Sequence, residues 1–160
     1  LSIYLHNLLL NVAGGCLINI RLASDFAYLN LAEVQLYDAS GALVARDTIA
    51  LKMSSFQAGA SPSNCNDGVL TSTNESQTCH SQISPFDPNP WLKIEYKCDI
   101  MLSKVMVYNR GEGSQERITK YLLEHIRDGR TLATYSFSAA GIKSVYQVDF
   151  GKSASTCARA

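Results

Sequence analysis

Apolar and polar residues alternate with a period of two along most of the chain. The pattern is clear in LINIRL (17–22) and in LNLAEVQLY (29–37). Further strand-like runs are WLKIEY (91–96), KVMVYN (104–109), ITKYLLEHI (118–126), TLATYSF (131–137) and SVYQVDF (144–150). Successive side chains of a strand point to opposite faces, so this period places one face in a core and the other in solvent. The pattern predicts an all-β chain of short strands.

Turn-forming sequences divide these runs. DASG (38–41) follows the second run, and Arg127-Asp128-Gly129-Arg130 is typical of a hairpin turn between two later ones. The run 118–126 also has features of a helix, but its Asp-Gly exit and its Ile and Tyr content favour a strand. Short strands separated by turns predict a sandwich or barrel rather than alternating strands and helices.

The alternation stops between residues 53 and 90, a segment rich in Ser, Asn, Gly and Pro. Loops longer than about 12–15 residues without their own structure tend to be functional or disordered. Cys65 and Cys79 lie inside this segment and favour an ordered one. We therefore expect part of the function here.

The size of the chain suits one domain, because a domain usually holds roughly 100–200 residues. We expect a single domain over residues 1–160, with an N-terminal extension (1–16) and a C-terminal tail (151–160). Lys plus Arg and Asp plus Glu each number 14. A balanced charge creates no field that would attract nucleic acid or an anionic membrane. The balanced charge therefore predicts no nucleic-acid partner. The apolar N-terminal stretch is interrupted by polar residues and is shorter than the about 20 residues that a membrane span needs, so we expect no membrane insertion.

Five cysteines stand at positions 16, 65, 79, 98 and 157, and none forms a CxxC pair. This spacing disfavours a metal–thiolate site and favours disulfides formed in an oxidising compartment. Asn74-Glu75-Ser76 is a glycosylation sequon and also indicates a secreted or cell-surface glycoprotein.

The disulfide pairing stays open at this stage. A Cys65–Cys79 bond would close the long segment, and a Cys16–Cys157 bond would join the two ends, which would leave Cys98 unpaired. The odd count leaves one thiol free or paired between chains, and the sequence alone does not choose among the arrangements.

The sequence carries no motif that predicts catalysis. It has no nucleophile elbow, no HExxH pair and no phosphate-binding glycine loop. Of the three histidines, His125 lies within a predicted strand, where a packed or surface role is commoner than a catalytic one. We therefore expect a binding protein rather than an enzyme.

Glu33 shares a face of its predicted strand with Leu29, Leu31 and Tyr37. A carboxylate on a buried face is costly unless it is paired or bound to a metal. A metal ion, an arginine partner and a solvent-exposed strand end are the three alternatives. The NCNDG stretch (64–68) offers oxygen ligands of the kind that Ca²⁺ prefers, although an Asx turn without an ion has the same sequence.

Arg110 and Arg117 flank a polar, glycine-containing stretch. One interpretation is a salt-bridged corner in which Glu112 and Glu116 hold the two guanidinium groups. The other is a binding site, in which the same two carboxylates orient a prepared set of hydrogen-bond donors.

Four segments together resemble the F-type lectins (fucolectins), which are relatives of the discoidin-like, galactose-binding-fold domains. The segments are LNLAEVQLY, SNCNDG, TCHSQISPFDPNPWLKIEY and VMVYNRGEGSQERI, and the resemblance spans residues 17–137. It implies an eight-stranded antiparallel β-sandwich jelly roll. It also implies a calcium-dependent lectin that binds fucose-like glycans or glycoproteins without catalysis.

The resemblance also assigns residues. His80, Arg110 and Arg117 match the family's sugar-binding positions. For a structural Ca²⁺ it implies the carboxylates of Glu33 and Asp67 and the carbonyl of Asn64, with further backbone oxygens from Val69 and from Gln77 or Thr78.

This chain differs from the family pattern in three respects. Gly113-Ser114 stands where many fucolectins have two adjacent cysteines that pack on the sugar. The LNLAEVQLY strand begins the domain instead of ending it, as in a permuted order, and a glycan on Asn74 would crowd the pocket around His80. These differences keep a second hypothesis open: a structural or adhesive subunit of a homo-oligomer or larger extracellular or cell-surface assembly, with a degenerate sugar site.

Overall fold

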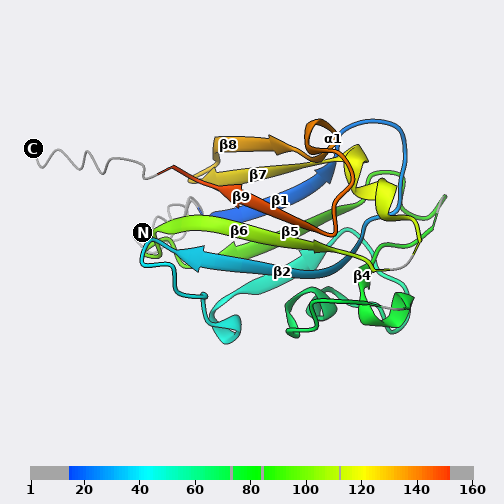
Figure 1. The fold of residues 1–160 in the computed structure, drawn as a ribbon, viewed down its shortest axis with the longest axis horizontal. Helices are drawn as coiled ribbons and strands as arrows, with labels where there is room; N and C mark the ends of the chain where they lie inside the picture. The colour runs from blue at the N-terminus through cyan, green and yellow to red at the C-terminus, as the bar shows by residue number, and fades with distance from the viewer. Residues whose placement is uncertain (1–14, 73, 84, 112, 152–160) are drawn as a thin grey trace, which may run out of the picture.

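A computed structural model describes residues 15–151, with the exception of 73, 84 and 112. These residues form two antiparallel sheets that pack face to face (Figure 1). The first sheet has the order β3-β5-β1-β7-β8 and the second has the order β4-β2-β6-β9. The predicted all-β sandwich is confirmed, and the described part of the chain contains nine strands where eight were expected.

The strands are β1 (Cys16–Leu22), β2 (Asn30–Asp38), β3 (Ala50–Met53), β4 (Cys79–His80), β5 (Trp91–Tyr96), β6 (Leu102–Asn109), β7 (Tyr121–Arg127), β8 (Arg130–Ser136) and β9 (Val145–Asp149). The short helices are η1 (Arg46–Thr48), η2 (Pro62–Asn66), η3 (Glu75–Gln77), η4 (Gln115–Lys120) and α1 (Phe137–Ala140).

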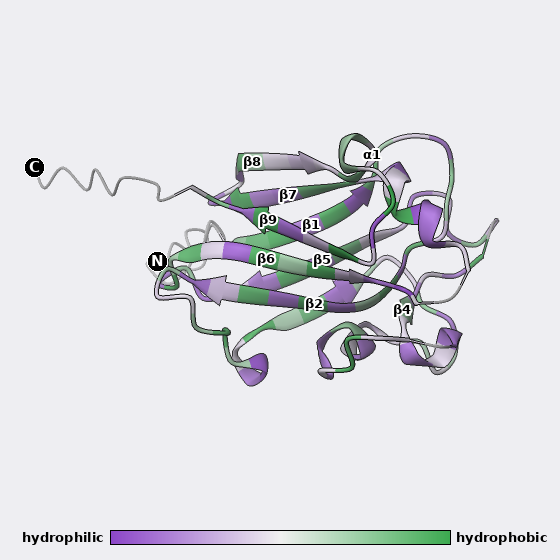
Figure 2. Ribbon diagram, in the orientation of Figure 1, coloured by the Kyte–Doolittle hydropathy of each residue, from purple (hydrophilic) through white to green (hydrophobic). Residues whose placement is uncertain are grey.

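The period-two pattern explains how the sheets form a core. Ile18 and Ile20 of β1 lie opposite Ile94 and Leu92 of β5, and all four side chains are buried. Figure 2 shows hydrophobic and hydrophilic residues alternating along β1. Burying one such side chain contributes about 1.5–3 kcal/mol, so a few facing pairs fix the register of the sheet.

The hairpin predicted at residues 127–130 joins β7 to β8. Asp128 and Gly129 both have positive φ, at 52° and 73°. Two central residues of this kind define the turn whose twist matches a two-residue hairpin.

Two short strands, β3 and β4, lie outside the runs that the sequence pattern marked. The segment 53–90 contains η2, η3 and β4 and is therefore ordered through most of its length. β4 has only two residues, and it exists because Cys79 and His80 pair with Leu31 and Asn30 of β2. The run 118–126 is also only partly a strand, because its first three residues belong to η4.

Two disulfides connect the described residues. The predicted Cys65–Cys79 bond is present, with a Cα–Cα distance of 5.3 Å. The expected Cys16–Cys157 bond is wrong, because Cys16 bonds to Cys98 at a Cα–Cα distance of 5.2 Å. The register explains this pairing, since Cys16 lies opposite Tyr96 at the end of β5 and Cys98 follows two residues later. Cys157 and Glu112 lie outside the described residues, as do residues 1–14 and 152–160.

Over residues 15–151, apart from the three omitted positions, we find no helix with the length and apolar character that a bilayer span requires.

Candidate functional site

Several polar side chains gather at one end of the sandwich, where β2 begins, β6 ends and β4 pairs with β2 (Figure 1). Asn30 opens β2 and lies opposite His80 of β4. Arg110 follows the last residue of β6, and Arg117 lies in η4. The structure thus brings the three predicted sugar-binding residues to the same end of the fold.

His80 is buried, with 1% of its surface exposed. Its Nδ1 lies 2.7 Å from the carbonyl oxygen of Ser81. Nε2 of Gln57 lies 3.3 Å from the same Nδ1, but the carbonyl is closer and only accepts, so we place the ring hydrogen on Nδ1 and leave the ring Nε2 as an acceptor. Nε2 has no hydrogen-bond partner among the described residues. A buried polar atom of this kind marks a place where a ligand donor fits.

Burial lowers the pKa of His80, and the positive charges of Arg117 and Arg110 act in the same direction. The contact with Ser81 and the carboxylate of Glu75 oppose this shift. The ring is therefore neutral at neutral pH. Oε1 of Glu75 lies 3.9 Å from Nε2 of the ring, so two acceptors face each other across the site.

Asn30 holds the two arginines together. With its amide oxygen directed toward them, as the surrounding donors require, Nη1 of Arg110 lies 3.0 Å and Nη1 of Arg117 lies 3.2 Å from that oxygen. Neither guanidinium lies within 4.0 Å of a carboxylate in the described part of the chain. Glu116 is exposed and does not pair with either of them. The cluster is oriented by an amide, and the other donors of both guanidinium groups stay available.

The turn between the two arginines brings both of them to one place. Asn109 donates from Nδ2 to the carbonyls of Gln115 and Lys143, which fixes the end of β6. Gly111 packs against Ser72 so closely that a Cβ there would lie 2.5 Å from the Ser72 carbonyl oxygen. Gly113 and Ser114 both have positive φ, at 59° and 56°, and the chain reverses between the arginines as a result.

An aromatic wall completes this cluster. The guanidinium carbon of Arg117 lies 4.9 Å from the ring centroid of Tyr28, which is a cation–π contact. The Tyr28 and His80 rings lie 6.0 Å apart, and Phe26 packs edge to face on Tyr28 at 5.1 Å. Beside this wall is a hollow of about 290 Å³, lined by Phe26, Ala27, Tyr28, Glu116, Arg117 and Lys120. Its volume is at the lower end of the range for small-ligand pockets.

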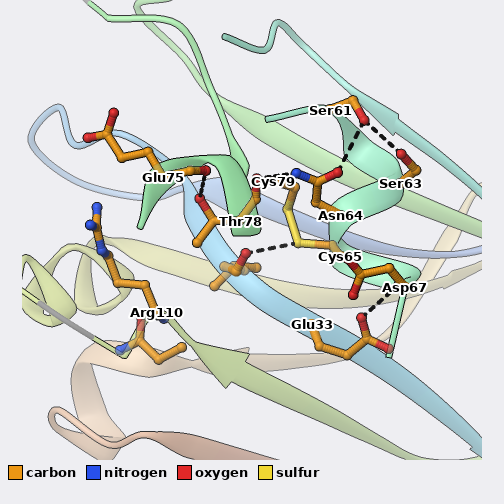
Figure 3. The surroundings of a disulfide bond; sticks show 12 residues. Glu33, Ser61, Ser63, Asn64, Cys65, Asp67, Glu75, Thr78, Cys79 and Arg110 are labelled. Atoms are coloured by element: carbon orange, nitrogen blue, oxygen red, sulfur yellow. Dashed lines mark hydrogen bonds between the residues drawn. A yellow bond between two sulfur atoms is a disulfide. The ribbon is translucent and has the colours of Figure 1, made fainter. Parts of the chain in front are cut away.

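Glu33 lies behind the cluster and is completely buried on β2. Its two oxygens accept hydrogen bonds from the backbone N–H groups of Asp67 and Gly68, at 3.1 and 3.2 Å. Nη2 of Arg46 lies 3.6 Å from the same carboxylate, and Nη1 donates to the Asp67 carbonyl oxygen at 3.0 Å. Figure 3 shows the Glu33 carboxyl group pointing to Asp67 at the end of η2.

Burial raises the pKa of Glu33 more than these donors and Arg46 lower it. The negative charge is therefore only partly compensated. The arginine partner considered from the sequence is present, and a cation at the oxygen atoms of Glu33 and Asp67 would compensate the rest.

The other residues assigned to the ion lie around Asn64. Nδ2 of Asn64 lies 3.0, 2.8 and 3.1 Å from the carbonyl oxygens of Gly59, Ser76 and Thr78. Val69 donates from its backbone N–H to Oδ1 of Asp67 at 2.8 Å, and Gln77 precedes Thr78 at the end of η3. The contacts thus form two separate groups: Glu33 of β2 with Asp67 and Val69, and Asn64 with Thr78. The acceptor atoms in these contacts, carboxylate and carbonyl oxygens, are the kind of ligand that a hard cation prefers, although here they accept from N–H groups.

The sequence also singled out His125 and Asn74. His125 lies apart from the arginine cluster, and Asn74 lies at its edge. His125 is packed, with Nε2 2.6 Å from the Tyr96 hydroxyl and its ring 4.6 Å from that of Phe150. Burial raises the pKa of this tyrosine to about 12. Asn74 is exposed at the start of η3, next to Glu75, so its side chain is accessible to a glycosylating enzyme.

Comparison with protein-family models, with curated proteins and with solved structures gives no match for this chain.

Sequence reasoning missed Asn30, Tyr28 and Glu75. Asn30 was hidden because the alternation of LNLAEVQLY places it on the face opposite Leu29 and Leu31, which suggests solvent. β2 is in fact buried on both faces through most of its length. The alternation carries no signal for this, because it cannot show that other segments cover the second face of the strand.

Proposed function

We propose that this chain is a non-catalytic, calcium-dependent carbohydrate-binding module, a lectin that recognises fucose-like glycans. The observation that carries the proposal is the convergence of Arg110 and Arg117 on Asn30, beside a buried imidazole whose Nε2 has no partner among the described residues. This arrangement supports the sugar-site residues that the resemblance to F-type lectins assigns.

The polarity of the cluster favours a hydroxylated, uncharged ligand. The guanidinium groups only donate, whereas Nε2 of His80 and the Glu75 carboxylate accept. A sugar hydroxyl donates and accepts at once and therefore satisfies both kinds of group. A phosphate or carboxylate would satisfy the arginines and would leave Nε2 of His80 without a donor.

The same chemistry favours binding over catalysis. Two of the three polar groups are guanidinium groups, which keep their protons in proteins and so cannot act as general acids or bases. The Tyr28 ring offers an apolar surface, in place of the adjacent cysteines that Gly113-Ser114 replaces.

A single site of this size should bind weakly. Each net hydrogen bond contributes about 0.5–1.5 kcal/mol, so a monosaccharide should have a Kd on the order of 0.1–1 mM. Strong binding to a glycoprotein or cell surface would require several copies of the module.

For calcium, we propose the carboxylates of Glu33 and Asp67 together with the backbone oxygens near Asn64, Val69, Gln77 and Thr78. A divalent cation held by these residues would supply positive charge to the buried Glu33 and would tie its strand to the loop that ends at His80. The proposal also includes a jelly-roll connection of the strands, secretion or display at the cell surface, and a glycan on Asn74.

The test is a calorimetric titration of methyl α-L-fucoside into the wild type and an Arg117→Ala variant. We expect binding by the wild type and none by the variant, because the donors to Asn30 and the cation on Tyr28 are both lost. Arg130→Ala is the matched control, since this arginine is exposed at the start of β8, and it should bind as the wild type does. Equal affinities for Arg117→Ala and the wild type would remove the lectin assignment.

The alternative is a structural or adhesive subunit whose sugar site is degenerate. One observation favours it: Asn30 already accepts from both arginines, so the cluster is internally satisfied in part. Non-reducing electrophoresis and fucose–agarose chromatography separate the two hypotheses. A disulfide-linked multimer that passes through the column supports assembly, whereas a monomer that elutes only with free fucose supports recognition.

A further inference from the structure

The hollow beside the cluster offers a second binding surface, in a role that rests on the proposed function. One wall is the loop before β2, with Phe26, Ala27 and Tyr28, and the other is η4, with Glu116, Arg117 and Lys120. Phe26 is 39% exposed there, so its ring is accessible to a ligand in the hollow.

Hydrogen bonds tie the two walls together. The backbone N–H of Ala23 donates to the Lys120 carbonyl at 2.8 Å. The Tyr121 hydroxyl, just after η4, donates to the Ala27 carbonyl at 2.5 Å. These contacts fix both ends of the loop that carries Phe26, so the hollow exists before any ligand binds.

The position of the hollow relates it to the sugar-binding cluster. Arg117 and Tyr28 belong to both, while His80 and Arg110 line only the cluster side. A monosaccharide held by the three polar groups would therefore direct a substituent past Arg117 and into the hollow.

The lining also indicates which chemistry fits. Phe26 packs edge to face on Tyr28, and its exposed ring face suits the apolar C–H face of a sugar ring. The charges nearly balance, since Glu116 accompanies Arg117 and Lys120 lies 3.8 Å from Asp25. We propose that this hollow is a second subsite that binds the adjoining, uncharged pyranose residue of the glycan.

The test compares a monosaccharide with a disaccharide. Methyl α-L-fucoside and α-L-fucosyl-(1→2)-galactose are titrated into the wild type, Phe26→Ala, Phe26→Tyr and Phe86→Ala. Phe86 is the matched control, because it is 74% exposed and lies outside the hollow. Thermal unfolding of each variant checks that the fold is intact.

We expect Phe26→Ala to weaken disaccharide binding roughly three- to tenfold more than it weakens monosaccharide binding. Phe26→Tyr, which keeps the ring, should restore the disaccharide affinity, and Phe86→Ala should match the wild type. If Phe26→Ala binds both ligands as the wild type does, or weakens both equally, the second subsite is refuted while the lectin function stands. If the wild type binds neither ligand, the lectin function itself is refuted.

Discussion

At the scale of single residues, the chemistry depends on polar side chains that are buried next to one another. Asn30 and His80 lie opposite each other across the β2–β4 pair. One accepts from two guanidinium groups and the other presents an acceptor nitrogen. Because buried polar groups cost free energy when they lack partners, the unpartnered Nε2 of His80 is the feature that the proposed sugar site would use.

Asn30→Ala tests whether the amide orients the arginines. Loss of two charge-assisted hydrogen bonds should lower the affinity for methyl α-L-fucoside about tenfold and should also lower the melting temperature. Gln35→Ala is the matched control, because Gln35 is also a buried amide on β2 and accepts from the Tyr37 and Tyr108 hydroxyls. The control should lose stability but keep its fucoside affinity. An Asn30→Ala variant with wild-type affinity contradicts the orienting role.

His125 predicts how stability depends on pH. Burial lowers its pKa in the folded protein, and Arg127 adds to this effect. The unfolded chain therefore takes up the proton first, near pH 6.5, and stability falls as the pH drops through that value toward the lower folded pKa. We expect chemical denaturation to show less loss of stability between pH 7.5 and 5 in His125→Gln than in the wild type. His80 contributes a similar slope to both proteins, and identical slopes would contradict the prediction.

At the scale of elements, the loop from η2 to β4 is held at three places. The Cys65–Cys79 disulfide closes it (Figure 3), Asn64 donates to the Ser76 and Thr78 carbonyls inside it, and Glu33 with Arg46 fixes its outer turn. Gly68 is required at that turn because its φ is +88° and a Cβ would collide with the Arg46 guanidinium. A loop fixed in this way sets the position of His80 at its end.

Arg46→Gln tests the charge balance at Glu33. Removing the guanidinium leaves a buried carboxylate with backbone donors alone, so the variant should lose about 1–2 kcal/mol of unfolding free energy. If a cation also binds at Glu33, added Ca²⁺ should raise the melting temperature of the variant more than that of the wild type, and EDTA should lower both. Differential scanning calorimetry with and without Ca²⁺ measures these shifts, with Arg130→Gln as the exposed control.

Two outcomes would contradict these expectations. Melting temperatures that do not respond to Ca²⁺ or EDTA in either protein would remove the calcium part of the proposal. An unchanged stability of Arg46→Gln would show that the backbone donors of Asp67 and Gly68 suffice for Glu33.

At the scale of the whole molecule, the sequence predicted the strands in which apolar and polar residues alternate. The long alternating runs became β1, β2, β5, β6, β7 and β9, each of which buries one or both faces in the same core, and β8, which pairs with β7 and buries only part of its surface. It did not predict β3 and β4, whose few residues carry no visible period and pair only because longer strands lie beside them. Cys16–Cys98 was missed for the same reason, since it depends on the β1–β5 register.

The residues of the candidate site also divide into those that the sequence predicted and those that it did not. The sequence pointed to Arg110 and Arg117 through their spacing, and to His80 through the resemblance to F-type lectins. Their orienting partner could not, because an asparagine between two leucines has no local signature and acquires its role only when β2, β4 and η4 meet. For Glu33, the sequence named an arginine partner as an alternative but could not identify Arg46.

The most direct measurement is the electron density of a crystal soaked in methyl α-L-fucoside. Our account predicts a pyranose ring whose hydroxyls accept from Arg110 and Arg117 and donate to Nε2 of His80, with the Tyr28 ring against its apolar face. A ring bound elsewhere on the molecule, or no ring while both arginines keep only their contacts with Asn30, would contradict it.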